Sequence, residues 1–220
     1  MRRKIITTGD GSKTIQILDW DEQYHSKHGA IQEAYHVFID NGLRLFKDEH
    51  LAISEIGLGT GLNALITLIE SKKLNLQIDY VGVEKYPVTE SELEQLNYIS
   101  DLNASSFQQQ FNLIHSSPWY EDVSISPNFK LLKQQRDFND IEEIEQFHLI
   151  YFDAFGARVQ PELWTTEIFK KMISSLKSGG VLVTYAAKGS VRRAMQEVGF
   201  IVERLPGPPG KREMLRAKKP

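Results

Sequence analysis

Short apolar runs alternate with amphipathic stretches along most of the chain. The apolar runs have the length and composition of strands and lie at residues 51–56, 77–84, 129–134, 147–155 and 181–185. Helical periodicity follows at residues 62–72, 161–177 and 190–198. The run FHLIYFDAF is apolar at nearly every position, as in strands that are buried on both faces. This alternation predicts an α/β fold with a doubly wound, mostly parallel sheet.

The two ends of the chain are expected to add smaller elements. Residues 1–19 alternate enough for a hairpin that turns at Gly9-Asp10-Gly11, and residues 30–39 have helical periodicity up to Asn41-Gly42. Polar loops and helices are expected over residues 87–128, one helix from Pro161 to Gly179-Gly180, and a closing pair of strands at residues 200–205 and 212–217. We therefore divide the chain into an N-terminal segment with a small hairpin and helix, residues 1–50, and a Rossmann-like domain, residues 51–220.

Three glycines at alternate positions, Gly57, Gly59 and Gly61, connect the first apolar run of this domain to the helix after it. Glycine tolerates a tight turn and lets backbone N–H groups approach a ligand at a helix N-terminus. The spacing G-x-G-x-G differs from the dinucleotide pattern, and no lysine follows as in a phosphate-binding loop. An ordinary tight turn is the alternative interpretation.

Acidic residues follow the ends of the next predicted strands. Glu84 ends the second strand, at the place where a carboxylate accepts hydrogen bonds from a ribose diol. Asp137 follows the third strand, where it can accept from an adenine amine, and Asp153 lies at the carboxyl edge, where open α/β sheets bind ligands. The alternatives are an exposed glutamate at a strand end and a loop aspartate.

Composition excludes several classes of protein. The 220 residues are 41% hydrophobic and 25% charged and contain no cysteine, so disulfides and thiolate metal sites are excluded. His25, His28 and His36 lack a zinc-binding spacing, and we expect no metal. The chain has neither a membrane-spanning run nor a secretory signal, so we expect it to be cytoplasmic, without a membrane partner.

Charge is distributed unevenly in spite of a net charge of −3. Residues 188–220 hold nine lysines and arginines against three acidic residues, whereas the rest of the chain is acidic. Such a segment is typical of a surface for a polyanion, or of a solvated basic tail.

Several motifs together resemble one family. EIGLGTGLN, VGVEKYP, DAF, PELWT and GKREML, with YHSKHGAIQEAYHVFIDNGL near the N-terminus, are similar to the tRNA 5-methylaminomethyl-2-thiouridine methyltransferases. This family comprises MnmD and the methyltransferase half of MnmC, and the resemblance spans nearly the whole chain. GARVQ after DAF and PGPPG before KREML depart from the family pattern and affect the expected substrate specificity.

The resemblance implies a class I S-adenosylmethionine-dependent methyltransferase fold with S-adenosylmethionine as the cofactor. The glycine turn would lie under its methionine portion, Glu84 would hold its ribose, and Asp153 would be catalytic beside the methyl group and the incoming amine. The expected cofactor residues are Glu55, Gly57, Gly59, Gly61, Asn63, Glu84 and Asp137.

The implied reaction is N-methylation of the aminomethyl group of 5-aminomethyl-2-thiouridine at the tRNA wobble position. The tRNA anticodon stem-loop would be the partner, with a functional link to the enzymes that make the aminomethyl precursor. Its phosphates would contact Lys188, Arg192, Arg193, Lys211 and Arg212. Because no second glycine-rich fingerprint is present, we expect no flavin oxidoreductase activity. The alternatives are a methyl- or aminopropyltransferase for small amines and a non-catalytic nucleoside-binding protein.

Overall fold

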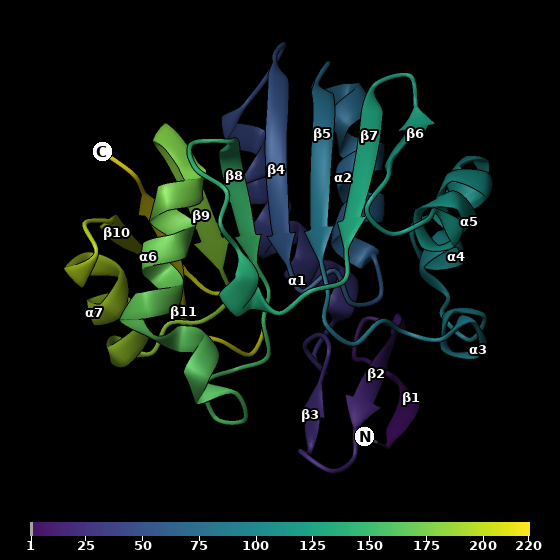
Figure 1. The fold of residues 1–220 in the computed structure, drawn as a ribbon. Coiled ribbons are helices and arrows are strands. Elements are labelled where there is room, and N and C mark those ends of the chain that lie inside the picture. The colour runs from purple at the N-terminus through teal and green to yellow at the C-terminus, as the bar shows by residue number, and fades with distance from the viewer. Residues whose placement is uncertain (1) are drawn as a thin grey trace.

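The structure, a computed structural model, describes residues 2–220, and within them the main sheet has eight strands (Figure 1). Their order is β10-β11-β9-β8-β4-β5-β7-β6. The five central strands run parallel, and β6, β10 and β11 pair antiparallel with their neighbours. The bounds are β4 (His50–Ile56), β5 (Gln77–Val83), β6 (Asp122–Ser126), β7 (Phe129–Gln134), β8 (Phe147–Phe152), β9 (Leu176–Thr184), β10 (Ile201–Pro206) and β11 (Glu213–Lys218).

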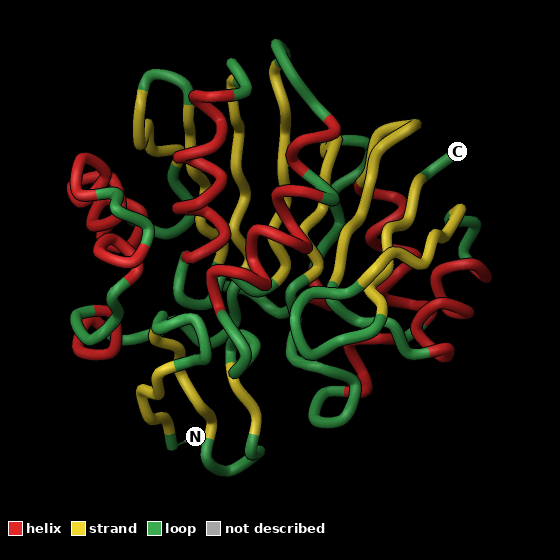
Figure 2. The backbone as a smooth tube through the Cα atoms, turned by 180° about the vertical axis from the view of Figure 1, so that it is seen from behind, coloured by secondary structure: helices red, strands yellow, loops and turns green. Residues whose placement is uncertain are grey.

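Helices cover both faces of this sheet. Figures 1 and 2 show α6 and α7 on one face and α1 and α2 on the other. The helix α1 continues directly into a π-helical turn, η1. The helices and turns are α1 (Ala30–Ala34), η1 (Tyr35–Asp40), η2 (Leu43–Leu45), α2 (Leu62–Lys73), α3 (Glu90–Leu93), α4 (Tyr98–Asp101), η3 (Ser105–Phe107), α5 (Gln108–Ser116), η4 (Phe138–Asp140), η5 (Pro161–Trp164), α6 (Thr166–Ser175) and α7 (Gly189–Glu197).

The sequence of β8 is apolar at successive positions because both faces of this strand are buried. Leu149 and Tyr151 pack into the apolar cluster under α1 and α2, while Ile150 and Phe152 pack into the cluster under α6 and α7. All four side chains are fully buried. Both layers of the core therefore depend on this strand, which ends next to Asp153.

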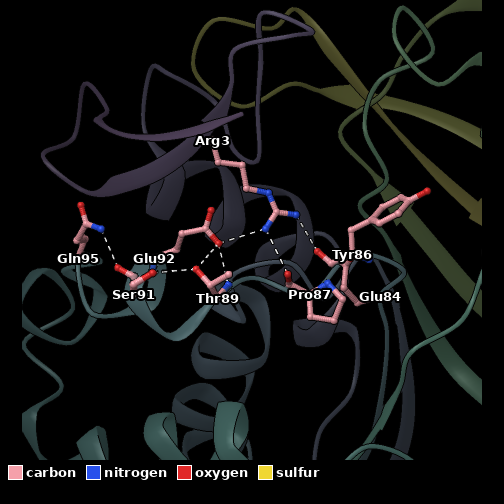
Figure 3. Close-up of polar contacts among 8 residues, drawn as sticks. All are labelled: Arg3, Glu84, Tyr86, Pro87, Thr89, Ser91, Glu92 and Gln95. Carbon is pink, nitrogen blue, oxygen red and sulfur yellow. Dashed lines mark hydrogen bonds and ion pairs between the residues drawn. The ribbon is translucent and has the colours of Figure 1, made fainter. Parts of the chain in front are cut away.

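A second, three-stranded sheet, formed by β1 (Arg3–Thr7), β2 (Lys13–Ile17) and β3 (Glu22–Gln23), lies beyond the carboxyl ends of the central strands (Figure 1). Arg3 attaches it to the segment after β5. Its guanidinium donates to the Tyr86 carbonyl at 2.9 Å, the Pro87 carbonyl at 3.2 Å and Glu92 Oε2 at 3.2 Å (Figure 3). Thr89 and Glu92 cap α3 reciprocally, which holds the Glu92 carboxylate in place for Arg3.

Most of the predicted elements are confirmed, including the mostly parallel sheet, the N-terminal hairpin and the closing strand pair. The expectation of only helices and loops over residues 87–128 is wrong, because Asp122–Ser126 forms the edge strand β6. Only Ile125 of this strand is buried, so the segment has no apolar face to identify it. The boundary between residues 50 and 51 stays a proposal.

The single helix expected from Pro161 to Gly179-Gly180 is also wrong. Thr165 is extended and separates the 3-10 turn η5 from α6, and β9 begins at Leu176. Leu176 pairs with Phe147, and the register of β9 then shifts before Val181. Burial of Leu176 in the sheet thus outweighs the local helical periodicity.

Candidate active site

The glycine turn between β4 and α2 lies against the backbone of the segment after β8. Gly57, Gly59 and Gly61 have φ angles of +98°, +50° and +71°, which side chains of L residues rarely adopt. A Cβ added to Gly57 would meet the Asp153 carbonyl oxygen at 2.8 Å. Glycine is thus required here both for the turn and for its close contact with the strand end that carries Asp153.

A buried hydrogen-bond network joins the glycine turn to Asp153. Asn63, in the first turn of α2, donates from Nδ2 to Glu55 Oε1 at 2.8 Å and to Asp153 Oδ2 at 2.9 Å. Tyr80 donates to Glu55 Oε2 at 2.7 Å. Burial raises the pKa of Glu55 well above its ordinary value, against the effect of these two donors. Asn63 Oδ1 is buried and has no hydrogen-bond partner within residues 2–220.

The backbone after Asp153 is fixed by hydrogen bonds from three sides. The Asp153 N–H donates to the Ile56 carbonyl at 2.9 Å. Tyr185 donates to the Ala154 carbonyl at 2.8 Å, and Trp164 Nε1 donates to the Phe155 carbonyl at 2.8 Å. The carboxylate therefore has a preorganised position, as a group that acts on a substrate requires.

The surroundings of Asp153 raise the pKa of its carboxyl group. Burial, and then the negative charge of Glu33, raise its pKa from 3.8 to about 7, while Asn63 and Lys211 act in the opposite direction. A carboxyl group with this pKa can accept a proton and release it near neutral pH.

Glu84 and Asp137 lie at the ends of β5 and β7, next to the glycine turn. Glu84 accepts N–H bonds from Gly59 at 3.0 Å and Tyr86 at 2.8 Å, and burial raises its pKa. Asp137 accepts from Lys85 Nζ at 2.5 Å and from the Asn139 N–H at 2.9 Å. The Lys85 hydrogen bond lowers the pKa of Asp137.

These groups surround a pocket of about 360 Å³ at the carboxyl edge of the sheet. Its floor is the glycine turn and the Asp153 segment, and the N-terminal residues 20–28 form the opposite wall. Aromatic rings line the space: Phe155 contacts Tyr24 edge-to-face at 5.0 Å between ring centroids and Trp20 at 5.6 Å. The predicted residues Glu55, Gly57, Gly59, Asn63, Glu84, Asp137 and Asp153 all line this pocket. Gly61 instead precedes α2 as its N-cap.

The sequence interpretation missed the pocket wall formed by the N-terminal segment. Tyr24 and Glu33 line the pocket, and Tyr24 lies directly over Gly59. The density of histidine, tyrosine and acidic residues between Trp20 and Gly42 is the signal in the sequence, but the partners lie far away along the chain.

The five predicted RNA-binding residues do not form one group. Lys211 lines the pocket and contacts Glu33. Lys188 and Arg193 are exposed at the start of α7, with Arg192 partly buried beside them, and Arg212 is exposed before β11. The topology places these four outside the pocket, at the same edge of the sheet.

The rings of His25 and His36, in the N-terminal segment, have hydrogen-bond partners. His25 contacts the Thr14 hydroxyl at 2.9 Å, and burial lowers its pKa to about 4. His36 Nε2 contacts the Pro206 carbonyl at 2.8 Å. Over the described part of the chain, no three His, Cys, Asp or Glu side chains are grouped to hold a metal ion. Nor does any helix between residues 2 and 220 have the length and apolarity to cross a membrane.

The chain is similar to known methyltransferases and to proteins of tRNA modification. Residues 125–220 match a family model described as S-adenosyl-L-methionine-dependent methyltransferase. The tRNA 5-methylaminomethyl-2-thiouridine biosynthesis bifunctional protein MnmC of Idiomarina loihiensis is 31% identical over 89% of this chain. The protein of the same name from Stutzerimonas stutzeri is 31% identical over 90% of it. The chain spans 35% and 34% of these relatives, about a third of their length.

Solved structures give the same result. The crystal structure of MNMC2 from Aquifex aeolicus is 25% identical, with a TM-score of 0.80, and covers 100% of this chain and 71% of its own. Spermidine synthase from Thermotoga maritima covers 100% of this chain and 73% of its own at 13% identity and a TM-score of 0.54, which shows the fold alone.

The resemblance predicted from the sequence is therefore confirmed, as is the class I S-adenosylmethionine-dependent methyltransferase fold. The matched family model supports S-adenosylmethionine as the cofactor. The pocket fits such a group, because its lining combines the glycine turn with the carboxylates of Glu84 and Asp137, and because the buried Asn63 Oδ1 has no hydrogen-bond partner within the described chain.

Proposed function

We propose that this protein transfers a methyl group from S-adenosylmethionine to the amine of 5-aminomethyl-2-thiouridine at the wobble position of tRNA. The similarity to MnmC proteins and to MNMC2 supports this substrate. The observation that carries the proposal is the position of Asp153: its carboxylate is fixed by Asn63 where the glycine turn, the aromatic wall and the pocket meet. Substrate would come from enzymes that install the aminomethyl group.

The residues of the chain divide the work of the reaction. The glycine turn and Glu84 would hold the cofactor, and Glu55, Asn63 and Asp137 would border it. The bound cofactor supplies a methyl group that is already activated by a sulfonium. The protein therefore has to orient the amine and remove its proton, because only a neutral amine has a lone pair for the attack.

Asp153 is the group proposed to take that proton. Its pKa of about 7 lets the carboxylate form accept a proton near neutral pH and release it afterwards to solvent. Asn63 holds one carboxylate oxygen at 2.9 Å, which leaves the other oxygen to face the amine. The pH optimum of the reaction should therefore follow the ionisation of this one side chain.

An unpaired wobble base can enter the pocket at small energetic cost, because it is not paired in the anticodon loop. Phe155, Tyr24 and Trp20 provide faces against which a base can stack. Lys188, Arg192, Arg193 and Arg212 lie at the same edge and would contact phosphates. Aromatic readout of the base and electrostatic contact with the backbone thus fall on neighbouring surfaces.

Methyl transfer from labelled S-adenosylmethionine tests the proposal against its main rival, transfer to a small amine. The acceptors are tRNA that carries the unmethylated aminomethyl group, fully modified tRNA, and putrescine without RNA. The proposal expects label only in the first. Label in putrescine, with none in tRNA, would instead support a small-amine transferase of the same fold.

A further inference from the structure

Glu33 is a buried acid in the substrate pocket with no role in the reaction described so far. It belongs to α1, its side chain is 8% exposed, and it lines the same pocket as Asp153. Oε2 accepts the Ser26 N–H at 2.7 Å, and Oε1 accepts from Lys211 Nζ at 2.5 Å. A buried carboxylate is costly unless it is paired, and here the Ser26 N–H pairs one oxygen while the Lys211 ammonium pairs the other.

Lys211 reaches this position from the turn between β10 and β11. Its ammonium lies 3.8 Å from the centroid of the Tyr185 ring, in a cation–π contact, while it contacts Glu33. Tyr185 is itself fixed by its hydrogen bond to the Ala154 carbonyl. An acid and an aromatic face thus hold a primary ammonium group in the pocket that Asp153 also lines, and Tyr185 contacts the residue that follows Asp153.

The charges of this subsite also match a cationic ligand. Glu33 and Asp153 are two acids in one pocket, and Lys211 is the cation that acts on both. The aminomethyl group of the proposed substrate ends in the same chemical group as Lys211, a primary amine. At neutral pH such an amine arrives largely protonated, and a carboxylate is the group that binds it selectively over a neutral isostere.

We propose that Glu33 selects the amine of the substrate: its carboxylate binds the ammonium form of the aminomethyl group beside Asp153, and Lys211 occupies that position until substrate displaces it. This inference rests on the proposed function and adds a specificity residue to it. Lys211 then acts within the pocket as a stand-in for substrate, in place of the phosphate contact expected from the sequence. Asp153 would take the proton from the bound ammonium, while Glu33 keeps the nitrogen in place.

The experiment compares two anticodon stem-loop RNAs, one with 5-aminomethyl-2-thiouridine and one with the neutral isostere 5-hydroxymethyl-2-thiouridine. Both are titrated into protein saturated with S-adenosylhomocysteine. Wild type should bind the amine RNA at least about tenfold more tightly, as for other charge-assisted hydrogen bonds. Glu33→Gln keeps an acceptor for the Ser26 N–H, and it should bring the ratio of the two affinities close to one without weakening the hydroxymethyl RNA.

Lys211→Met should strengthen the preference for the amine RNA, if Lys211 occupies the position of the substrate ammonium. With its competitor removed, the amine RNA should bind several-fold more tightly, and the hydroxymethyl RNA should be unchanged. Glu121→Gln and Lys218→Met replace exposed residues of the same types away from the pocket and serve as matched controls. Thermal denaturation and cofactor affinity verify that each variant is folded.

A purely structural ion pair predicts something else. Glu33→Gln and Lys211→Met would then both lower the melting temperature, and the ratio of the affinities for the two RNAs would keep its wild-type value. That result would overturn the inference. Weaker binding of the amine RNA to Lys211→Met would also overturn it. Failure of the proposed function is distinguishable, because wild type would then neither methylate the aminomethyl tRNA nor prefer the amine RNA.

Discussion

Asn63 Nδ2 bridges two acids, with Asp153 Oδ2 at 2.9 Å and Glu55 Oε1 at 2.8 Å. The amide thereby connects the first turn of α2 to the ends of β4 and β8, which are the elements that form the floor of the pocket. Its hydrogen bond stabilises the charged form of Asp153 and lowers the pKa that burial raises. A residue of the glycine-turn motif thus limits how far burial and Glu33 raise the pKa of the proposed catalytic acid.

Replacement of Asn63 by the isosteric leucine should shift the pH dependence of methyl transfer. Without the donor, the charged form of Asp153 is less stable, so its pKa rises above about 7. The acidic limb of the rate profile should move to higher pH, measured at saturating cofactor because Asn63 also borders the cofactor region. An acidic limb at the wild-type position would contradict the role given to this hydrogen bond.

Asp153→Asn should lower the rate of methyl transfer by roughly two to four orders of magnitude, the range typical of a positioned acid or base. Cofactor affinity, measured by calorimetry, should stay within a few-fold of wild type, because the substitution keeps the size and the backbone hydrogen bond of the residue. Near-normal turnover would exclude Asp153 as the proton acceptor.

The same variant has a readout that is independent of activity. The folded protein raises the pKa of Asp153 from 3.8 to about 7, so its contribution to stability is fully present below about pH 4 and is lost as the pH rises through about 7. The melting temperature of Asp153→Asn should therefore increase relative to wild type between about pH 4 and about pH 7 and keep a constant difference at higher pH. A difference that does not change with pH would mean that the acid is ionised throughout.

Gly57→Ala should abolish cofactor binding and methyl transfer. The new Cβ would be 2.8 Å from the Asp153 carbonyl oxygen, at a φ of +98°, so the turn or the Asp153 segment has to move. Gly179→Ala is the matched control, since Gly179 also has a positive φ, +76°, but a Cβ there meets nothing within 4 Å. Both variants carry backbone strain, and only the first should lose S-adenosylmethionine binding in calorimetry. Equal losses would contradict a special role for the glycine turn.

The exposed basic residues should act on tRNA binding alone. Simultaneous replacement of Arg192, Arg193 and Arg212 by glutamine should weaken tRNA binding and flatten its dependence on salt. With fewer phosphate contacts, tRNA binding releases fewer counterions. Affinity for S-adenosylmethionine should not change. An unchanged salt slope would place the tRNA elsewhere on the protein, with residues 20–42 as the next segment to test.

The central sheet and the floor of the site were predictable because their signals are local. Glycines at alternate positions identify the turn, and the acids at the strand ends identify Glu84 and Asp153. Each pattern lies within a few residues of sequence. The strand β6 was not predictable in this way, because an edge strand with one buried side chain carries no periodic pattern. Nor was the end of α6, where packing of Leu176 in the sheet outweighs helical periodicity.

The wall of the pocket depends on contacts between distant segments, which sequence patterns do not reveal. Glu33 and Lys211 are 178 positions apart, and Arg3 contacts residues 83 to 89 positions further along the chain. The position of Lys211 differs from the one that the charges of neighbouring residues in the sequence suggest. Its sequence context favours a solvated basic segment, but its ammonium lies between an acid and an aromatic ring inside the pocket.

Nucleoside analysis of the product tests the central claim most directly. tRNA that carries 5-aminomethyl-2-thiouridine is incubated with the protein and S-adenosylmethionine, digested, and analysed by mass spectrometry, with Asp153→Asn as the control. We predict that the wobble nucleoside becomes heavier by one methyl group, located on the amine nitrogen, with wild type and only in trace amounts with Asp153→Asn. An unchanged wobble nucleoside, or a methyl group on any other nucleoside, would contradict the account.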